Sequence, residues 1–500
     1  MKILTWIALV VVATAAAVSV AQSQNSATAD SCAKLTSLKL PHVEITGAAM
    51  TQTGAAHCKI LGTARPTADS DIRFEVLIPQ DWNGRYLQVG NGGFAGAIPE
   101  AAMIAAAAQG YAVAGTDNGH VAAGTDASWA LGHPEKQIDF GYRALKETTD
   151  AAKAIIVAYT GKAPHYSYFQ GCSDGGREAL MEAQRYPQDF DGIVAGDPAS
   201  YWSHLETAVA WDYQALTATP GSWIPPAKLK LIQAEAVRQC GDEDGVIQDP
   251  EGCRFRPAKI RCKSGDAPDC LSDAQLTALN AIHAGPRNPR TGAKIFSGFS
   301  PGGESENQGW TRWITGTVPG DTKTSAYAIA SNFFRYLVHA DPNYDIAKMN
   351  FDGDVALADE TGGRIINSHS PDLSAFQKRG GKLIQYHGWA DPAIPALDSI
   401  DYYKSVQAKM GKTGQFYRLF LAPGMLHCSG GPGPNRLATL PAITRWVEEG
   451  AAPDQLVATK YQDNDPAKPV ERVRPLCVWP ARAQWDGKGD KSKLESFRCG

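Results

Sequence analysis

The spacing of apolar residues along the chain changes several times, and these changes predict its secondary structure. Between residues 72 and 90, apolar and polar positions alternate on both sides of Asn83-Gly84, a dipeptide typical of tight turns between paired strands. This segment is therefore predicted to form a β-hairpin. Beyond it, short apolar runs typical of buried strands alternate with longer helical patterns. The predicted helices cover residues 101–109, 140–160 and 175–185, and the predicted strands cover 111–115, 166–170 and 192–195.

Strands that alternate with helices of this length indicate a parallel sheet with helices on both faces. The alternation stops near residue 201 and resumes near residue 381, and the segment between these points is rich in loops and short polar helices. Beyond the interruption, strands are predicted at 382–386 and 416–421 and helices at 398–409 and 437–449. We therefore expect an α/β fold whose core, residues 24–200 and 381–500, is interrupted by an inserted domain at residues 201–380.

The first residues have the pattern of a secretory signal peptide. Lys2 precedes an apolar run from Ile3 to Val20, and the run is followed by Ala21-Gln22-Ser23, which resembles a cleavage region. Residues 1–23 are thus predicted to direct export, so that the mature protein is secreted or periplasmic and not attached to a membrane. An uncleaved membrane anchor is the alternative, because the run is close to the shortest apolar segment that spans a bilayer.

Composition and charge exclude several classes of protein. The 500 residues are 43% hydrophobic and 20% charged, and their 12 Trp, 17 Tyr and 15 Phe exclude intrinsic disorder. The 48 basic and 52 acidic residues give a net charge of −4, so the basic excess of a nucleic-acid-binding protein is lacking. Ten cysteines in a chain predicted to be exported indicate up to five disulfides, and without a C-x-x-C pair a zinc ribbon is not expected. The oligomeric state is left open by these features.

One short motif carries a specific chemistry. Gly171-Cys172-Ser173-Asp174-Gly175 matches G-x-S-x-G and stands between a predicted strand and a predicted helix. A serine on such a sharp turn projects its hydroxyl from the edge of the sheet, and the flanking glycines avoid steric clash. The N-terminus of the following helix favours negative charge, as an oxyanion requires. The motif predicts Ser173 as a nucleophile.

A serine nucleophile needs a histidine base and an acidic partner, which follow the serine in the order acid, then histidine, in folds of this type. Asp391 stands just past the predicted strand 382–386, and His427 stands in the loop after strand 416–421. Because the carboxyl ends of parallel strands meet at one edge of a sheet, both suit a triad with Ser173. The competing histidines, expected to be structural, are His120, His369 and His387.

Two cysteines are adjacent in sequence to the proposed triad. Cys172 precedes Ser173, and Cys428 follows His427. We expect a disulfide between them, which would connect the serine to the histidine across the insertion. Two unrelated structural cysteines are the alternative.

These residues resemble a known family. Cys172-Ser173, Asp391 and His427-Cys428 look like the CS-D-HC signature of the tannase and feruloyl esterase family, which also contains the bacterial hydrolase of mono(hydroxyethyl) terephthalate. Further similar segments are residues 90–96, 192–198, 371–376 and 386–392. The resemblance implies an α/β-hydrolase core with a large lid domain inserted between the nucleophile and acid segments. It also implies Ser173 as nucleophile, His427 as base and Asp391 as the orienting acid. The implied oxyanion donors are the backbone N–H groups of Asp174 and of Gly92 or Gly93.

The resemblance also raises the question of a metal. Family members usually carry a calcium loop in the lid, with spaced acidic ligands followed by Gly-x-Ile. The corresponding segment here is shorter and leaves Asp242, Asp244 and Val246 as candidate ligands. Because calcium prefers about six to eight oxygen ligands, a shortened loop can lose or weaken the site. An acidic loop closed by Cys240 and Cys253 without metal is the alternative, and no cofactor is implied for catalysis.

Taken with the resemblance, the sequence predicts a secreted serine carboxylesterase that acts on small esters of aromatic, hydroxycinnamic-type acids, similar to a feruloyl esterase. A tannase, which hydrolyses galloyl esters, and a mono(hydroxyethyl) terephthalate hydrolase remain open alternatives. A catalytically silent binding protein on the same fold and a peptidase are rivals from other classes. Candidates for stacking on the aromatic acid are Trp310, Trp313, Phe333, Phe334 and Tyr336.

Overall fold

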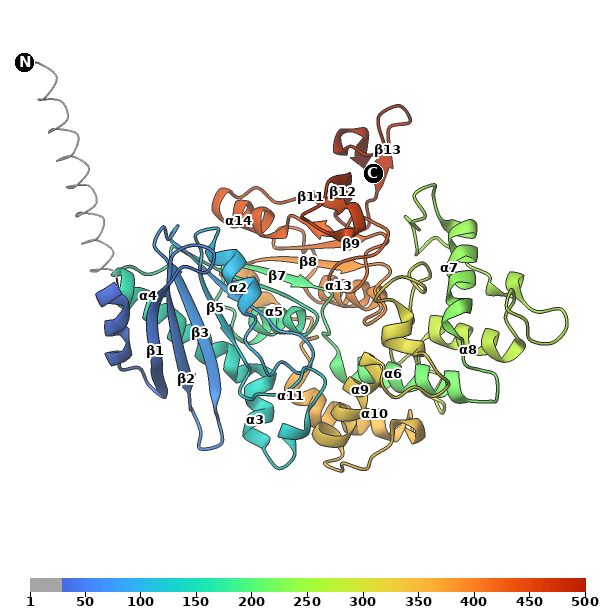
Figure 1. Cartoon of the computed structure of the whole chain (residues 1–500), viewed down its shortest axis with the longest axis horizontal. Helices are drawn as coiled ribbons and strands as arrows, with labels where there is room; N and C mark the ends of the chain where they lie inside the picture. Colours follow the sequence, from blue (N-terminus) through green and yellow to red (C-terminus); the bar gives the residue numbers. More distant parts are fainter. Residues whose placement is uncertain (1–28) are drawn as a thin grey trace, which may run out of the picture.

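The computed structural model describes residues 29–500 (Figure 1). The predicted signal peptide lies outside the described residues. Within residues 29–500, no helix has both the length and the apolar character needed to cross a membrane.

A nine-stranded sheet forms the centre of the molecule, with the strand order β1-β2-β3-β5-β4-β6-β7-β8-β9. The pairs β1·β2, β2·β3 and β3·β5 are antiparallel, and all the other pairs are parallel. The strands are β1 (Val43–Thr51), β2 (His57–Ala64), β3 (Ile72–Pro79), β4 (Arg85–Val89), β5 (Ala112–Thr116), β6 (Tyr166–Cys172), β7 (Gly192–Gly196), β8 (Lys382–Gly388) and β9 (Tyr417–Ala422). The predicted parallel sheet is confirmed for its larger part, and an antiparallel extension adds β1 to β3.

The predicted hairpin at residues 72–90 is wrong. Both strands are present, but β5 lies between them and pairs with β3 in the antiparallel sense and with β4 in the parallel sense. The chain leaves β4 and passes through helix α2 (Glu100–Ala107) before it returns as β5. All five residues of β5 are buried, so this short strand of small apolar residues takes a central position. Local alternation identified the strands, whereas their pairing depends on this distant segment.

Side chains on the two faces of the sheet belong to two separate hydrophobic cores, as the alternation along each strand requires. On β6, Phe169 belongs to one core and its neighbour Tyr168 to the other, and on β7 Ile193 and Val194 divide in the same way. The first face is covered by α4 (Ala144–Thr160), α5 (Asp174–Arg185), α12 (Ser374–Lys378) and α13 (Ala396–Met410). The second face is covered by α2, α14 (Thr439–Glu449), β11 (Gln455–Tyr461) and β12 (Val470–Cys477).

Outside the hairpin, the predicted helices and strands coincide with observed elements whose ends differ by a few residues. The helix predicted at 140–160 begins as a π-helical turn at Asp139–Arg143 and continues as α4, which ends where Gly161 adopts a left-handed conformation with φ 74°. Glycine adopts this conformation without steric cost, which explains the end of the helix.

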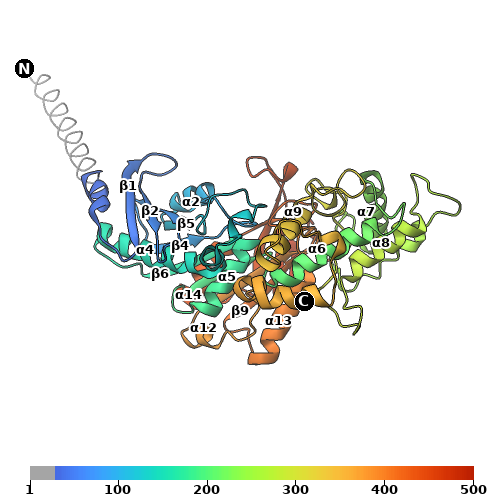
Figure 2. The same ribbon diagram turned by 90° about the horizontal axis from the view of Figure 1, so that it is seen from below.

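A helical segment of residues 197–381 connects β7 to β8. Its helices are α6 (Trp202–Thr217), α7 (Pro226–Cys240), α8 (Asp273–Ala284), α9 (Ser325–Asn332), α10 (Gly353–Ala358), α11 (Arg364–Ile366) and α12. Figures 1 and 2 show α7 and α8 at the end of the molecule opposite to β1 and β2. The segment also contacts the core, because the ring of Trp202 packs against Phe94 in the loop after β4, with 5.4 Å between centroids. The insertion therefore reaches the loops at the edge of the sheet, and its role as a lid stays a prediction.

All ten cysteines are paired, which confirms the expected five disulfides. The bridges are Cys32–Cys58, Cys172–Cys428, Cys240–Cys253, Cys262–Cys270 and Cys477–Cys499. The last of these secures the C-terminal hairpin of β13 (Ala483–Trp485) and β14 (Phe497–Cys499) to the end of β12.

Candidate active site

Ser173 occupies a sharp turn between β6 and α5. Its backbone has φ 66° and ψ −123°, a strained conformation for a residue with a side chain. The neighbouring glycines are required by close approach: a Cβ on Gly171 would lie 2.3 Å from the carbonyl oxygen of Gly175, and one on Gly175 would lie 2.8 Å from that of Asn91. The turn therefore holds the serine at the edge of the sheet, as the motif predicts.

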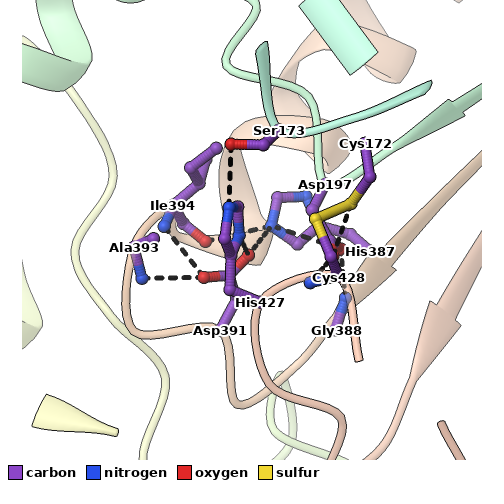
Figure 3. Close-up of a disulfide and its surroundings, with 10 residues drawn as sticks. All are labelled: Cys172, Ser173, Asp197, His387, Gly388, Asp391, Ala393, Ile394, His427 and Cys428. Atoms are coloured by element: carbon purple, nitrogen blue, oxygen red, sulfur yellow. Dashed lines mark hydrogen bonds and ion pairs between the residues drawn. A yellow bond between two sulfur atoms is a disulfide. The ribbon is translucent and has the colours of Figure 1, made fainter. Parts of the chain in front are cut away.

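The side chains of Ser173, His427 and Asp391 form a continuous hydrogen-bonded chain (Figure 3). Nε2 of His427 lies 2.8 Å from Oγ of Ser173, and Nδ1 lies 2.7 Å from Oδ2 of Asp391. Oδ1 of Asp391 accepts the N–H groups of Ala393 and Ile394 at 2.7 and 3.0 Å. With the proton on Nδ1 donated to Asp391, Nε2 is free to accept the proton of the serine hydroxyl.

The electrostatics of the pair favour an ionised acid beside the histidine. Burial alone would raise the pKa of Asp391, but His427 and His387 outweigh it and hold this pKa below its ordinary value. Burial alone would lower the pKa of His427, but the carboxylate of Asp391 raises it above its ordinary value. Asp391 thus stays charged and can stabilise an imidazolium on His427.

His387 contacts Asp391 and has no hydrogen bond with Ser173. Its Nε2 donates to the carbonyl of Ile394 at 3.0 Å and lies 3.3 Å from Oδ2 of Asp391, while Nδ1 lies 2.7 Å from Oγ of Ser399. This position orients the acid. The other two competing histidines stack on aromatic rings, His120 on Trp129 and His369 on Tyr201.

Asp197, directly after β7, joins the site although no role was assigned to it from the sequence. Its Oδ1 accepts the N–H of Gly388 at 2.8 Å, and its Oδ2 accepts the N–H of Cys428 at 2.5 Å (Figure 3). Burial raises the pKa of this carboxyl to about 6, against the opposing effect of His387. Its place at the carboxyl end of a parallel strand was the available signal.

The structure joins Cys172 to Cys428 by a disulfide whose ends are 256 residues apart in sequence and 5.9 Å apart between Cα atoms. The bond connects the residue before Ser173 to the residue after His427 (Figure 3). Cys428 adopts a left-handed backbone with φ 61°, so the loop turns sharply at this point. The serine and histidine segments are therefore covalently linked beside their hydrogen bond.

The expected oxyanion donors lie on two adjoining segments. The loop after β4 is held beside the first turn of α5 because the N–H of Gly175 donates to the carbonyl of Asn91 at 2.8 Å and the N–H of Asn91 donates to Oε2 of Glu178 at 2.9 Å. The N–H groups of Gly92 and Gly93 donate to no other residue among 29–500, and the first N–H groups of a helix such as α5 have no acceptor within it. The assignment of these N–H groups to one oxyanion hole stays a prediction.

Buried charged and polar side chains hold α5 and the loop after β4 together. Arg177 Nε donates to Oδ1 of Asp174 at 2.5 Å, and Asn118 Nδ2 donates to Oε1 of Glu178 at 2.5 Å. Burial and the nearby Asp174 raise the pKa of Glu178 to about 8. All these groups are inaccessible to solvent, so they fix the backbone of α5 and the loop after β4.

The candidate metal ligands make other contacts. Asp242 Oδ1 accepts the N–H groups of Asp244 and Val246, and the carbonyl of Val246 accepts the N–H of Asp242. The carboxylate of Asp244 pairs with Arg472 at 3.0 Å and Arg474 at 2.8 Å. These residues do not fit a calcium ion as arranged, because two guanidinium groups already face the central carboxylate. Arg472 and Arg474 lie on one face of β12, far from the loop in sequence.

Of the aromatic residues considered for stacking, Trp313 reaches the site. Its ring lies edge-on to that of His427, with 5.3 Å between centroids and an interplanar angle of 72°. Trp310 is buried in a hydrophobic core of the insertion, and Phe333 and Phe334 are buried in a core that the insertion shares with the loops of the sheet. Tyr336 packs against this second core.

Comparison with known proteins finds relatives that are esterases. Residues 58–500 match a family model described as tannase and feruloyl esterase. An uncharacterised esterase of Xanthomonas campestris pv. campestris is 42% identical, with 98% of this chain and 94% of that protein covered. A mono(2-hydroxyethyl) terephthalate hydrolase of Piscinibacter sakaiensis is 32% identical, with 89% and 84% covered. The crystal structure of feruloyl esterase B from Aspergillus oryzae superposes with a TM-score of 0.86 at 27% identity, covering 95% of this chain and all of that one.

Proposed function

The chain belongs to the tannase and feruloyl esterase family, and on this premise we propose that it is a secreted serine carboxylesterase for esters of hydroxycinnamic-type acids. The observation that carries the proposal is the hydrogen-bonded chain from Ser173 through His427 to Asp391 at a strained strand-to-helix turn. The predicted signal peptide and the five disulfides support export.

In the proposed reaction, Oγ of Ser173 attacks the ester carbonyl and gives its proton to Nε2 of His427. The N–H groups of Asp174 and of Gly92 or Gly93 stabilise the oxyanion of the tetrahedral intermediate. The imidazolium then protonates the leaving alcohol as the carbonyl–oxygen bond breaks, which leaves an acyl-enzyme. Water then attacks the acyl group while His427 takes one of its protons. As the bond from the acyl carbon to Oγ of Ser173 breaks, His427 returns this proton to Oγ, and the acid and the free serine are released.

The remaining side chains hold this geometry. Asp391 keeps the proton on Nδ1 of His427 and stabilises its charged form, and Asp197 holds the loops that carry both residues. Every step is served by side chains and backbone groups of the chain, and no cofactor is proposed for catalysis.

The proposed substrate class follows the similarity to feruloyl esterase B, whose fold extends over nearly the whole chain. The similarity to a mono(2-hydroxyethyl) terephthalate hydrolase supports a terephthaloyl ester as the second candidate. Hydrolysis of methyl ferulate, methyl gallate and mono(2-hydroxyethyl) terephthalate by the purified protein discriminates between these acids. A silent binding protein would hydrolyse none of them, and digestion of casein would indicate a peptidase.

A further inference from the structure

A small recess lies beside the triad, in the contact between the insertion and the core. Its lining includes Asp212, Tyr213, Trp313, Tyr327 and Ala393. Two of these residues touch the triad directly: the N–H of Ala393 donates to Asp391, and the ring of Trp313 contacts that of His427. The recess therefore shares two of its lining residues with the surroundings of the triad.

Asp212 is the unusual member of this lining. It projects from α6, only 5% of it is exposed, and among residues 29–500 its carboxyl group has no hydrogen-bond or ion-pair partner. The buried carboxyl groups of Asp391 and Asp197 differ in this respect, because each accepts two backbone N–H groups. Since buried polar groups are normally paired, the carboxyl of Asp212 lacks a partner that a ligand can supply.

The surroundings define the chemistry of that ligand. Burial raises the pKa of Asp212 well above its ordinary value and so favours the protonated form of the carboxyl group. In that form it offers one O–H donor and one carbonyl acceptor. No lysine or arginine lines the recess. The nearby Arg312 instead stacks on Trp313 and donates to Gln308 and Ser325. A carboxylate would thus be buried here without a counter-charge, whereas a hydroxyl would be satisfied.

The size of the recess agrees with a hydroxyl. It has room for about one water molecule. That is enough for a hydroxyl at the tip of an aromatic ring when the ring itself stays outside the recess. Aromatic side chains of Tyr213, Trp313 and Tyr327 surround this space and favour a ring at its mouth.

We propose that this recess is the subsite for the ring hydroxyl of a phenolic acid, and that Asp212 is the residue that recognises it. The inference rests on the proposed esterase function and narrows it. Esters of 4-hydroxylated acids are selected over esters of unsubstituted rings and over monoesters that carry a second carboxylate.

The test compares methyl 4-hydroxycinnamate with methyl cinnamate, which differ only in the hydroxyl. For the wild-type protein, kcat/KM for the hydroxylated ester is expected to be roughly tenfold higher, the effect of one buried hydrogen bond. In Asp212→Leu the ratio of the two kcat/KM values should fall toward one. In Asp212→Asn most of this ratio should be kept, because the amide also donates and accepts hydrogen bonds. Mono(2-hydroxyethyl) terephthalate is expected to be hydrolysed at least about tenfold less efficiently than methyl 4-hydroxycinnamate.

Glu206 provides a matched control. It lies on the same helix, is equally buried, has an unpartnered Oε2 and does not line the recess. Glu206→Leu should leave the ratio of the two esters as in the wild type. An unchanged ratio in Asp212→Leu, or a wild-type ratio near one, overturns the subsite while the esterase function stands. The wild-type ratio is measured without any variant, so it tests the subsite even if Asp212→Leu does not fold. Failure of the wild-type protein to hydrolyse either ester overturns the proposed function itself.

Discussion

The carboxylate of Asp197 accepts a hydrogen bond from the backbone N–H of Cys428, 231 residues further along the chain, at 2.5 Å. The same carboxylate accepts the N–H of Gly388. One side chain at the end of β7 thus fixes both the loop that carries Asp391 and the loop that carries His427. The disulfide of Cys428 to Cys172 completes this connection on the side of the serine.

Asp197→Asn should reduce kcat by about tenfold or more with little change in KM, because an amide cannot accept both N–H groups as a carboxylate does. The negative charge of Asp197 also raises the pKa of His427. Its removal lowers that pKa, so the acidic limb of the kcat/KM profile, where His427 must be deprotonated, moves to lower pH. A pH profile of methyl ferulate hydrolysis checks both effects. A variant with the wild-type kcat and an unshifted limb would show that Asp197 has no influence on the base.

Replacement of Cys172 and Cys428 by alanine should lower kcat more than it changes KM, because the distance from His427 to the serine is no longer held by a covalent bond. Closing so long a loop contributes at most roughly 5 kcal/mol to stability in the entropy model, so the melting temperature should fall as well. The matched control replaces Cys262 and Cys270, whose bridge spans only 8 residues within the insertion. Equal kcat values for the two double variants would contradict a role in the site, and a free thiol at Cys172 in active protein would refute the bridge.

Gly93→Ala should reduce kcat by about a hundredfold, the effect of losing one oxyanion donor. A Cβ at Gly93 would lie 2.1 Å from the carbonyl oxygen of Gly124, which forces the loop to move. Gly132 is the control, because it has a similar left-handed backbone and open space around its Cβ position. Gly132→Ala should cost about 1 kcal/mol of stability from backbone strain and leave kcat unchanged. If both variants had similar kcat values, Gly93 would not be an oxyanion donor.

Chelation with EDTA should leave the melting temperature unchanged, because Asp244 is neutralised by Arg472 and Arg474. Asp244→Asn should lower the melting temperature by about 1 °C, since partly exposed ion pairs contribute little. Differential scanning calorimetry with and without added calcium measures both. A lower melting temperature in EDTA that calcium restores would show that the loop rearranges and binds the metal.

The sequence predicted the parts of this structure that depend on local pattern. Strands such as 192–195 were identified from short runs of apolar residues, and helices such as 175–185 from the helical spacing of apolar residues. Both patterns are local, because each element buries apolar side chains against a core next to the sheet. The pairing of β3 and β4 was not predictable in this way, since β5 enters between them from further along the chain. The strands β1, β2, β11 and β12 were not identified; β1, for example, has a single buried position among its nine residues and therefore a weak apolar pattern.

In the candidate site, too, features marked by local sequence were predicted and contacts between distant segments were not. Ser173 was marked by a motif, and Asp391 and His427 by their places after strands, so their meeting could be expected. Asp197, which accepts two backbone N–H groups, was marked only by its place after a strand, and no motif set it apart from other acids in such places. The ion pairs of Asp244 join segments more than 200 residues apart, and no spacing rule links them.

The central claim, covalent ester hydrolysis by Ser173, is tested most directly by the turnover of methyl ferulate in the wild-type protein and in Ser173→Ala. The wild-type protein should hydrolyse the ester, and the variant should retain its melting temperature and lose about 10⁴ to 10⁶ in kcat. Wild-type turnover in a folded Ser173→Ala variant would contradict the claim, because the ester would then be cleaved without the serine.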